Sequence, residues 1–397
     1  MKKKELFTLC ALGLALLGSS ASAYAQNSDN NKPGYKLLTT ISNIPGNLAG
    51  VFDISWVDSE TGRYYLTTRG VTTVTPPVGP SVTVIDTEHD KYLFSIPLST
   101  PGNGVFAIHR VGNDDEEGGP GTLVVGGNDS TAIFIDLARP FAPPTAVPTN
   151  RTTPPLAGVV NGRADELAYD PADHIILIAN DRATPDPFVS FISVGSNPQK
   201  VGEIVYDGTS GPKSTGGIEQ PVWDKVTRRF YIAIPSTAMH PNGEVDVIDP
   251  ITKKITNFIA TSCNPAGLAL IPGQRLMTSC GDILDIGTHA VVTTVDPGVP
   301  VVDEIWFNPG DERVYFGALF SSPVLSGVPP YRLIDTLQWN GFIAPPPPQF
   351  SHSIAADSEN NHVFVPVTNV GVLVFARNQE DDQGENNQGE NNQGHDN

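Results

Sequence analysis

The chain has little cysteine, and this scarcity removes several kinds of site. Its 397 residues hold three cysteines and no Cys-x-x-Cys-His motif, which excludes covalent attachment of a haem through that motif. Cys10 lies inside an apolar N-terminal stretch, which leaves Cys263 and Cys280 as one pair. No motif fixes a histidine beside either residue, so catalysis by a thiol has no support. We therefore predict a disulfide between Cys263 and Cys280, and the alternative is two free buried thiols.

Basic residues are also scarce. The chain has 24 Lys and Arg against 43 Asp and Glu, which gives a net charge of −19 at pH 7. Binding of phosphate groups depends on Lys and Arg, so nucleic acid and anionic lipid are excluded as partners. The partners that this charge admits are cations, cationic or neutral small molecules, and proteins.

Long apolar runs are absent beyond the N-terminus, so we expect no membrane insertion. The N-terminus has three lysines, an apolar stretch over 6–17 and small residues after it, a pattern typical of a secretory signal peptide. We predict a signal peptide over residues 1–25 and export to the periplasm or the exterior. We expect residues 26–34 to be flexible, and residues 378–397, which are rich in Asn, Gln, Gly and acids, to form a disordered tail.

No window of a dozen residues shows the 3.6-residue apolar period of a surface helix. Short β-branched runs dominate instead, such as SVTVID (81–86), HIILIAN (174–180) and RFYIAIP (229–235). The 38 Gly and 36 Pro supply turn residues between them. These features predict an all-β chain.

One pattern of apolar runs recurs along the chain. Each copy has an apolar run, a turn of Asp, Asn, Pro or Gly, a second run, a polar loop and a third run that often ends in Ile-Asp. Seven copies of roughly 40–50 residues, a period longer than that of a β-helix, predict a seven-bladed β-propeller over 35–377. The last copy has three strands, so we expect the segment 35–44 to complete its blade and close the ring. We place the copies at 52–96, 102–137, 165–194, 219–259, 264–295, 303–339 and 352–376.

Acidic pairs stand directly before two of the first runs, in GRADELAYDP (162–171) and VPVVDEIWFNP (299–309). In a propeller the first strand of each blade lines the central channel, and all first strands begin on one face. The loop between the second and third strands lies on that same face. Acids from separate blades therefore converge on one rim of the channel, which we predict to bind a ligand. The predicted rim residues are Asp53, Arg69, Asp165, Glu166, Asp181, Asp303 and His352.

Several carboxylates around a narrow opening repel one another. At about 5 Å and an effective dielectric constant of 20, each pair is disfavoured by roughly 3 kcal/mol. Three kinds of partner can offset this cost. A divalent cation such as Ca²⁺ can bind the oxygens, Arg69 and Arg163 can pair with them, or backbone amides can cap each acid within its own blade. The residues alone do not choose among the three, and no other cofactor is expected.

An aromatic residue recurs at one position of the first strand. Trp56, Tyr169, Trp223 and Trp306 occupy it in four of the copies. We interpret this position as core between blades rather than as a platform on which a ligand stacks.

Three stretches carry a resemblance to a known family: DPADHIILIAND (170–181), GEVDVIDPITKKI (243–255) and NNHVFVPVTNVGVLVF (360–375). In them a strand ending in Asn precedes a strand ending in Ile-Asp. The chain resembles the YVTN/YncE-type repeat proteins in this respect over residues 35–377. The resemblance implies a seven-bladed propeller outside the cytoplasm, and it implies little about activity.

Two segments resemble a second family. EQPVWDKVTRRFYIAI (219–234) is similar to the Glu-Gly-Pro-x-Trp blade of SMP-30/gluconolactonase-type enzymes, and NPAGLALIPG (264–273) is similar to their Asn-Gly-Leu segment. The resemblance implies that Glu219 and Asn264 are ligands of a divalent metal. The chain departs from that family at Gln220, where the family has Gly.

Two functions follow from these features. The first, which we favour, is an exported, monomeric binding scaffold whose acidic rim holds a cation, a small molecule or a protein. The second is a metal-dependent hydrolase of lactones or related esters, with no residue assigned to catalysis beyond the metal ligands. The candidate metal ligands are Glu219, Asn264, Glu166 and Glu304.

Overall fold

The fold is that of a computed structural model, which describes residues 34–49, 52–72, 74–109, 121–151, 162–299, 301–327, 330–338 and 350–378. The predicted signal peptide, residues 26–33 and the tail beyond residue 378 lie outside these ranges. Within them no helix is long and apolar enough to cross a membrane. The short 3₁₀ helix η1 (Pro45–Leu48) is the one helix in the described part of the chain.

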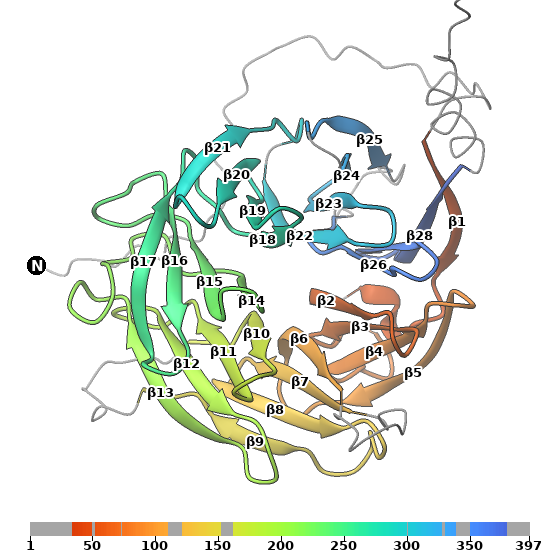
Figure 1. Ribbon diagram of the computed structural model, residues 1–397. Coiled ribbons are helices and arrows are strands. Elements are labelled where there is room, and N and C mark those ends of the chain that lie inside the picture. The colour runs from red at the N-terminus through yellow and green to blue at the C-terminus, as the bar shows by residue number, and fades with distance from the viewer. Residues whose placement is uncertain are drawn as a thin grey trace, which may run out of the picture. The chain divides into compact units, whose positions relative to one another are not determined.

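The described residues form seven antiparallel sheets of four strands each, which confirms the seven-bladed β-propeller (Figure 1). Blades 1 to 3 contain β2 (Phe52–Asp58), β3 (Arg63–Thr68), β4 (Ser81–Asp86), β5 (Lys91–Pro97); β6 (Gly102–Ile108), β7 (Thr122–Gly127), β8 (Thr131–Asp136), β9 (Thr145–Pro148); and β10 (Leu167–Asp170), β11 (Ile175–Asn180), β12 (Phe188–Ser193), β13 (Gln199–Val205). Blades 4 to 6 contain β14 (Pro221–Asp224), β15 (Arg229–Ile234), β16 (Glu244–Asp249), β17 (Lys254–Ala260); β18 (Leu268–Ile271), β19 (Arg275–Thr278), β20 (Asp282–Asp285), β21 (Ala290–Thr294); and β22 (Val302–Asn308), β23 (Arg313–Ala318), β24 (Ser321–Leu325), β25 (Leu333–Gln338). Blade 7 contains β26 (Ala355–Ala356), β27 (Val363–Val367), β28 (Gly371–Arg377) and β1 (Tyr35–Ile41).

Blade 7 joins the two ends of the propeller, as the sequence predicts. β1 pairs with β28 in the sheet order β1-β28-β27-β26, with Tyr35 opposite Arg377 and Ile41 opposite Val372. The hydroxyl of Tyr35 lies 2.8 Å from that of Tyr315 in blade 6. The N-terminal strand β1 and the C-terminal strand β28 therefore pair in one sheet, which closes the ring.

The first strand of every blade lies at the centre of the ring (Figure 1). Each of these strands contacts the first strand of the next blade, from β2 round to β26 and back to β2. The backbones approach closely there. A Cβ atom added at Gly104 would lie 2.4 Å from the carbonyl oxygen of Asp165 in the next blade. Glycine is required at this position because no side chain fits between the two strands.

The hydrophobic core lies between neighbouring blades. Because side chains alternate along a strand, Leu177 of β11 faces blade 4 while Ile178 faces blade 2. One cluster joins Leu177 to Phe230 and Ile232 of blade 4, and all three are fully buried. Burial of each such side chain stabilises the fold by about 1.5–3 kcal/mol. The alternating runs in the sequence thus bind each blade to both of its neighbours.

Two of the predicted repeat copies end too early. The copies at 102–137 and 165–194 omit the fourth strands of their blades, β9 and β13. Both strands lie on the outside of the ring and many of their side chains are exposed, so TAVP and QKVGEIV carry little of the apolar alternation that marks the inner strands. The pattern is weak because these strands bury little apolar surface.

The cysteine pair forms a disulfide, as the sequence predicts. The Cα atoms of Cys263 and Cys280 lie 6.0 Å apart. Cys263 precedes β18 and Cys280 follows β19, so the bridge fastens the end of the inner hairpin of blade 5 where its first strand begins.

Candidate functional site at the central channel

Arg163 pairs with several acids at the rim end of the channel, where the first strands of the blades begin. Its guanidinium contacts Asp53 of blade 1 at 3.0 Å, Asp165 of blade 3 at 2.6 Å and Asp181 of blade 3 at 3.2 Å. The side chain of Arg163 is only 13% exposed, and those of the three aspartates are 5–7% exposed. These three predicted rim residues therefore converge, and an arginine compensates their charge.

Burial and ion pairing act in opposite directions on these groups. Burial raises the pKa of Asp165, Asp181 adds to the shift, and Arg163 opposes it. Burial by itself lowers the pKa of Arg163, but the charges of Asp165, Asp53 and Asp181 raise it well above its ordinary value. Arg163 is therefore charged at every pH at which the protein is folded, and it holds together the starts of β2 and β10.

Arg69 extends the network toward blade 2. Its Nη2 donates to the carboxylate of Asp53 and, at 2.9 Å, to Oδ1 of Asn103. Asn103 in turn donates through Nδ2 to the carbonyl oxygen of Ala164 at 3.0 Å. Asn103 was not predicted as a rim residue, although it follows Asp53 by one repeat at the start of β6. Its signal in the sequence is an amide side chain at the repeat position that Asp53, Asp165 and Asp303 occupy in other blades.

His352 and Asp303 form a second charged pair at this end. Nδ1 of His352 lies 3.0 Å from Oδ2 of Asp303, and its Nε2 lies 3.2 Å from the carbonyl oxygen of Phe52, whose ring stacks on the imidazole at 5.2 Å. Burial lowers the pKa of His352, but Asp303 and Asp53 outweigh it and raise the pKa to about 9. Burial also opposes ionisation of Asp303, yet His352 brings the pKa of Asp303 below its usual value. Both groups are therefore charged at neutral pH.

The side chain of Glu304 caps backbone groups of the next blade. Its Oε2 accepts hydrogen bonds from Ser353 Oγ at 2.5 Å and from the backbone N–H of Ile354 at 3.1 Å, both in blade 7. Gln220 likewise accepts from the backbone N–H of Leu268 in the following blade at 2.7 Å. Capping by backbone amides of the same blade was one of the three alternatives for such residues. They cap the next blade instead, because the first strands lie side by side around the channel.

Glu166 and Glu219 differ from their neighbours. Glu166 is 7% exposed, and its Oε2 is buried without a hydrogen-bond partner in the described structure. Burial raises the pKa of Glu166, and the charges of Asp165 and Asp303 raise it further. Burial, with Asp303 and Asp181, also raises the pKa of Glu219, to about 8. Glu166, Glu219 and Glu304 interact electrostatically and so lie toward the same end of the molecule.

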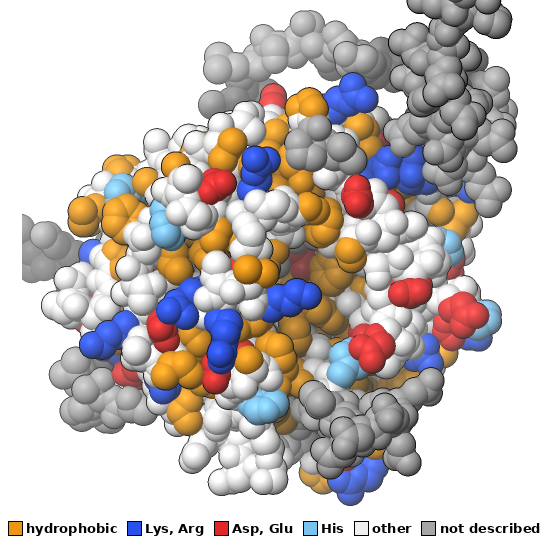
Figure 2. All heavy atoms as spheres, in the orientation of Figure 1, with side chains coloured by type: hydrophobic (Ala, Val, Ile, Leu, Met, Phe, Trp, Pro, Cys, Tyr) orange, Lys and Arg blue, Asp and Glu red, His pale blue; other side chains and the backbone are white. Residues whose placement is uncertain are grey.

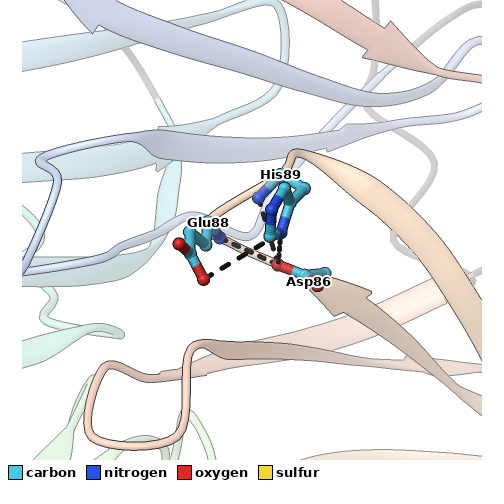
Figure 3. A group of neighbouring side chains, drawn as sticks. All are labelled: Asp86, Glu88 and His89. Atoms are coloured by element: carbon cyan, nitrogen blue, oxygen red, sulfur yellow. Dashed lines mark hydrogen bonds and ion pairs between the residues drawn. The ribbon is translucent and has the colours of Figure 1, made fainter.

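The candidate metal ligands are not gathered into a coordination group. Among the described residues the one set of three His, Cys, Asp or Glu ligands within 4.8 Å of one another is Asp86, Glu88 and His89 (Figure 3). That set is a turn in which Asp86 accepts hydrogen bonds from the backbone N–H groups of Glu88 and His89. Asn264 is exposed, and its Nδ2 donates to the carbonyl oxygens of Pro235 and Pro241. A divalent cation on Glu219, Asn264, Glu166 and Glu304 stays a prediction.

A cavity of about 870 Å³ occupies the channel beyond the rim. It extends from the level of Glu166 and Glu304 to the turns at the far ends of the first strands, such as Pro171 and Pro272. Figure 2 shows hydrophobic side chains around the hollow at the centre of this face. None of the residues that line it belongs to the Arg163 network. The channel thus has a charged end and an open apolar end.

Aromatic residues form much of the cavity wall: Trp56, Phe106, Tyr169, Trp223 and Phe307. The rings of Trp56 and Phe106 lie 4.2 Å apart, and Trp306 packs edge-on against Trp56 at 5.0 Å. Trp306 lies in the core between blades, as predicted for this position. Trp56, Tyr169 and Trp223 pack against the core and also face the cavity, so the prediction describes only part of their role.

No family model and no curated protein matches the chain. Among solved structures it is similar to the crystal structure of the WD40 β-propeller domain of Doa1, with a TM-score of 0.58 over 87% of this chain and 98% of that chain. The sequence identity is 14%. At this identity the likeness shows the fold alone, and the protein is a seven-bladed β-propeller without an assigned family.

Proposed function

We propose that the protein is an exported binding propeller that holds a small organic ligand in the central cavity, at the end opposite the charged rim. The observation that carries this proposal is the aromatic-lined cavity of about 870 Å³. Sites for small molecules have volumes of about 300–1,000 Å³ and are mostly apolar, with a few polar groups that orient the ligand. Glu166 supplies such a polar group at the inner end of the cavity.

The rim suits a bracing role better than the ligand-binding role first expected of it. Asp53, Asp165 and Asp181 already have a common partner in Arg163, and Asp303 has one in His352. A cation that bound these aspartates would compete with arginine and histidine inside the protein. A small ligand in the cavity displaces no such partner.

Three features support the exported location. The disulfide between Cys263 and Cys280 suits an oxidising compartment outside the cytoplasm. The N-terminal pattern of a signal peptide and the resemblance to the exported YVTN/YncE-type propellers agree with it.

Thermal unfolding in the presence of small aromatic molecules tests the binding function. A ligand at 100 times its Kd stabilises the native state by about 2.7 kcal/mol, so a binder raises Tm. The variant Val222→Trp, which fills the cavity wall, is expected to lose this response. Val292→Trp on the outer strand β21 makes the same chemical change at a residue that is 49% exposed, and it is expected to keep the response. If Val222→Trp folds and every binder still raises its Tm, the ligand binds elsewhere.

The metal-dependent hydrolase is the second candidate, and the local resemblance around Glu219 and Asn264 favours it. It predicts about one divalent ion per chain by elemental analysis, and loss of both metal and lactone hydrolysis in Glu219→Ala. A metal-free protein that stays inert toward lactones in added Ca²⁺, Mn²⁺ or Zn²⁺ would end this candidate.

A further inference from the structure

Glu166 is a buried carboxyl of the cavity that lacks a hydrogen-bond partner. This inference rests on the proposed binding function and concerns the chemistry of the ligand. Glu166 lines the cavity, is 7% exposed, and its buried Oε2 accepts no hydrogen bond within the described structure. A buried polar atom without a partner costs about 1–3 kcal/mol, and more when it is charged. A ligand that donates a hydrogen bond to this carboxyl offsets part of that cost.

The neighbouring positions show that the free oxygen is particular to Glu166. Glu304 and Gln220 hold the equivalent positions in blades 6 and 4, and both line the same cavity. Their side-chain oxygens accept backbone N–H groups of the next blade. In blade 2 the equivalent residue is Gly104, which offers no side chain. Among these residues of the inner end, Glu166 presents an acceptor to a ligand.

The surroundings of Glu166 favour a positive charge. Asp165, Glu219, Asp303 and Glu304 act on it electrostatically and all are acidic, although Arg163 pairs with Asp165 and His352 with Asp303. The cavity wall adds the faces of Trp56, Phe106, Tyr169 and Trp223, and aromatic faces attract cations. Lys225 is the one lysine or arginine among the described lining residues, and it follows β14 at the outer end of the cavity.

We propose that the ligand is an organic ammonium ion with an aromatic or otherwise hydrophobic body. The ammonium N–H donates to the carboxylate of Glu166, and the body packs against Trp56, Phe106 and Trp223. A bare metal ion does not fit this place, since Ca²⁺ takes six to eight oxygen ligands and the wall is mostly aromatic and aliphatic. A neutral ligand fills the same volume but leaves the carboxyl of Glu166 without a cation.

Calorimetric titration with a matched pair of probes tests this proposal. The cation is 2-(naphthalen-2-yl)ethylamine, and its neutral counterpart is 2-(naphthalen-2-yl)ethanol. Wild-type protein is expected to bind the amine at least about 10-fold more tightly than the alcohol, because a hydrogen bond to a charged group is worth about 1.5–3 kcal/mol. Glu166→Gln keeps the shape of the side chain and is expected to weaken binding of the amine about 10-fold, with little change for the alcohol.

Glu60→Gln is the matched control. It removes the same charge from a side chain at the outer end of the cavity that is 72% exposed, and it is expected to change neither affinity more than about 3-fold. Thermal unfolding of each variant shows that it is folded. Equal binding of amine and alcohol, with no effect of Glu166→Gln, would overturn the ammonium proposal and leave the binding function standing. Absence of binding by both probes at millimolar concentration would also overturn it, and the wider ligand panel then tests the binding function separately.

Discussion

The two ends of the central channel use the same strands for different purposes. At the rim end, Arg163 and His352 pair with acids from blades 1, 3 and 6, and the side chains of Arg163 and His352 are only 13% and 14% exposed. One residue further along the first strands, Glu166 and Glu304 form the inner end of a cavity whose wall is aromatic. The comparison teaches that a buried network of ion pairs fills the rim end, while a wall that is mostly apolar is left available at the other end, where the ion pair of Asp58 with His109 lies.

The largest effect on the free energy of unfolding is expected from removing the charge of Arg163. Arg163→Met leaves Asp53, Asp165 and Asp181 buried without their common partner, so it is expected to lower the free energy of unfolding by about 3–5 kcal/mol. Chemical denaturation measures this loss. Arg182→Met is the control, since Arg182 pairs with Asp181 but is 73% exposed and is expected to contribute about 1 kcal/mol or less. A loss below 1 kcal/mol for Arg163→Met would mean that the rim is not held by this arginine.

The next effect concerns the disulfide at the same end. Replacing Cys263 and Cys280 together with serine opens a loop with a sequence separation of 17 residues, so the free energy of unfolding is expected to fall by about 3 kcal/mol. Reductant is expected to destabilise the wild type by a similar amount and to leave the double variant unchanged. Equal stability of the two proteins without reductant would show that the bridge does not brace the rim.

The charge of His352 makes rim stability depend on pH. Its pKa is about 9 in the folded protein against 6.5 when unperturbed, so its contribution is complete below pH 6.5 and is lost as pH rises through 9. The difference in unfolding free energy between wild type and His352→Gln is expected to be constant from pH 5 to 6 and to shrink by on the order of 2 kcal/mol by pH 9.5. The difference removes titrations common to both proteins, while Glu304, whose pKa His352 lowers, contributes to it. A difference that stays flat up to pH 9.5 would contradict the charged pair with Asp303.

The smallest effect is expected at the open end. Glu60 lies 3.6 Å from His109, and its side chain is 72% exposed, so Glu60→Gln is expected to change the free energy of unfolding by less than about 0.5 kcal/mol. The same denaturation experiment measures it. A loss above 1 kcal/mol would show that charge also stabilises this end, and the contrast between the two ends would weaken.

The sequence predicts the ring and the place of the acids well, because both depend on a repeated local pattern. Asp53 and Asp303 are the second residues of β2 and β22, and Asp165 lies two residues before β10. The common entry face of the first strands brings all three to one rim. The choice among possible partners of the acids lies beyond such reasoning. Arg163 reaches Asp53 across a separation of 110 residues, and no local pattern encodes that contact.

The open cavity was also not predicted, and the reason for this is different. Whether the channel is filled depends on the sizes of all the inward side chains together, including small ones such as Gly104 and Ala107. The repeated aromatic position was recognised, but a ring that packs against the core on one side and faces a cavity on the other has the same sequence pattern as one that is wholly core. Trp56 and Trp306 illustrate the two cases, since only Trp56 lines the cavity.

A crystal structure of the protein with bound 2-(naphthalen-2-yl)ethylamine tests most directly the claim that the apolar end, and not the charged rim, receives the ligand. We predict density for the naphthyl group against Trp56 and Phe106, with the amine nitrogen within hydrogen-bond distance of Glu166. Density for the amine at Asp303 or Asp181, with the central cavity left unfilled, would contradict the claim.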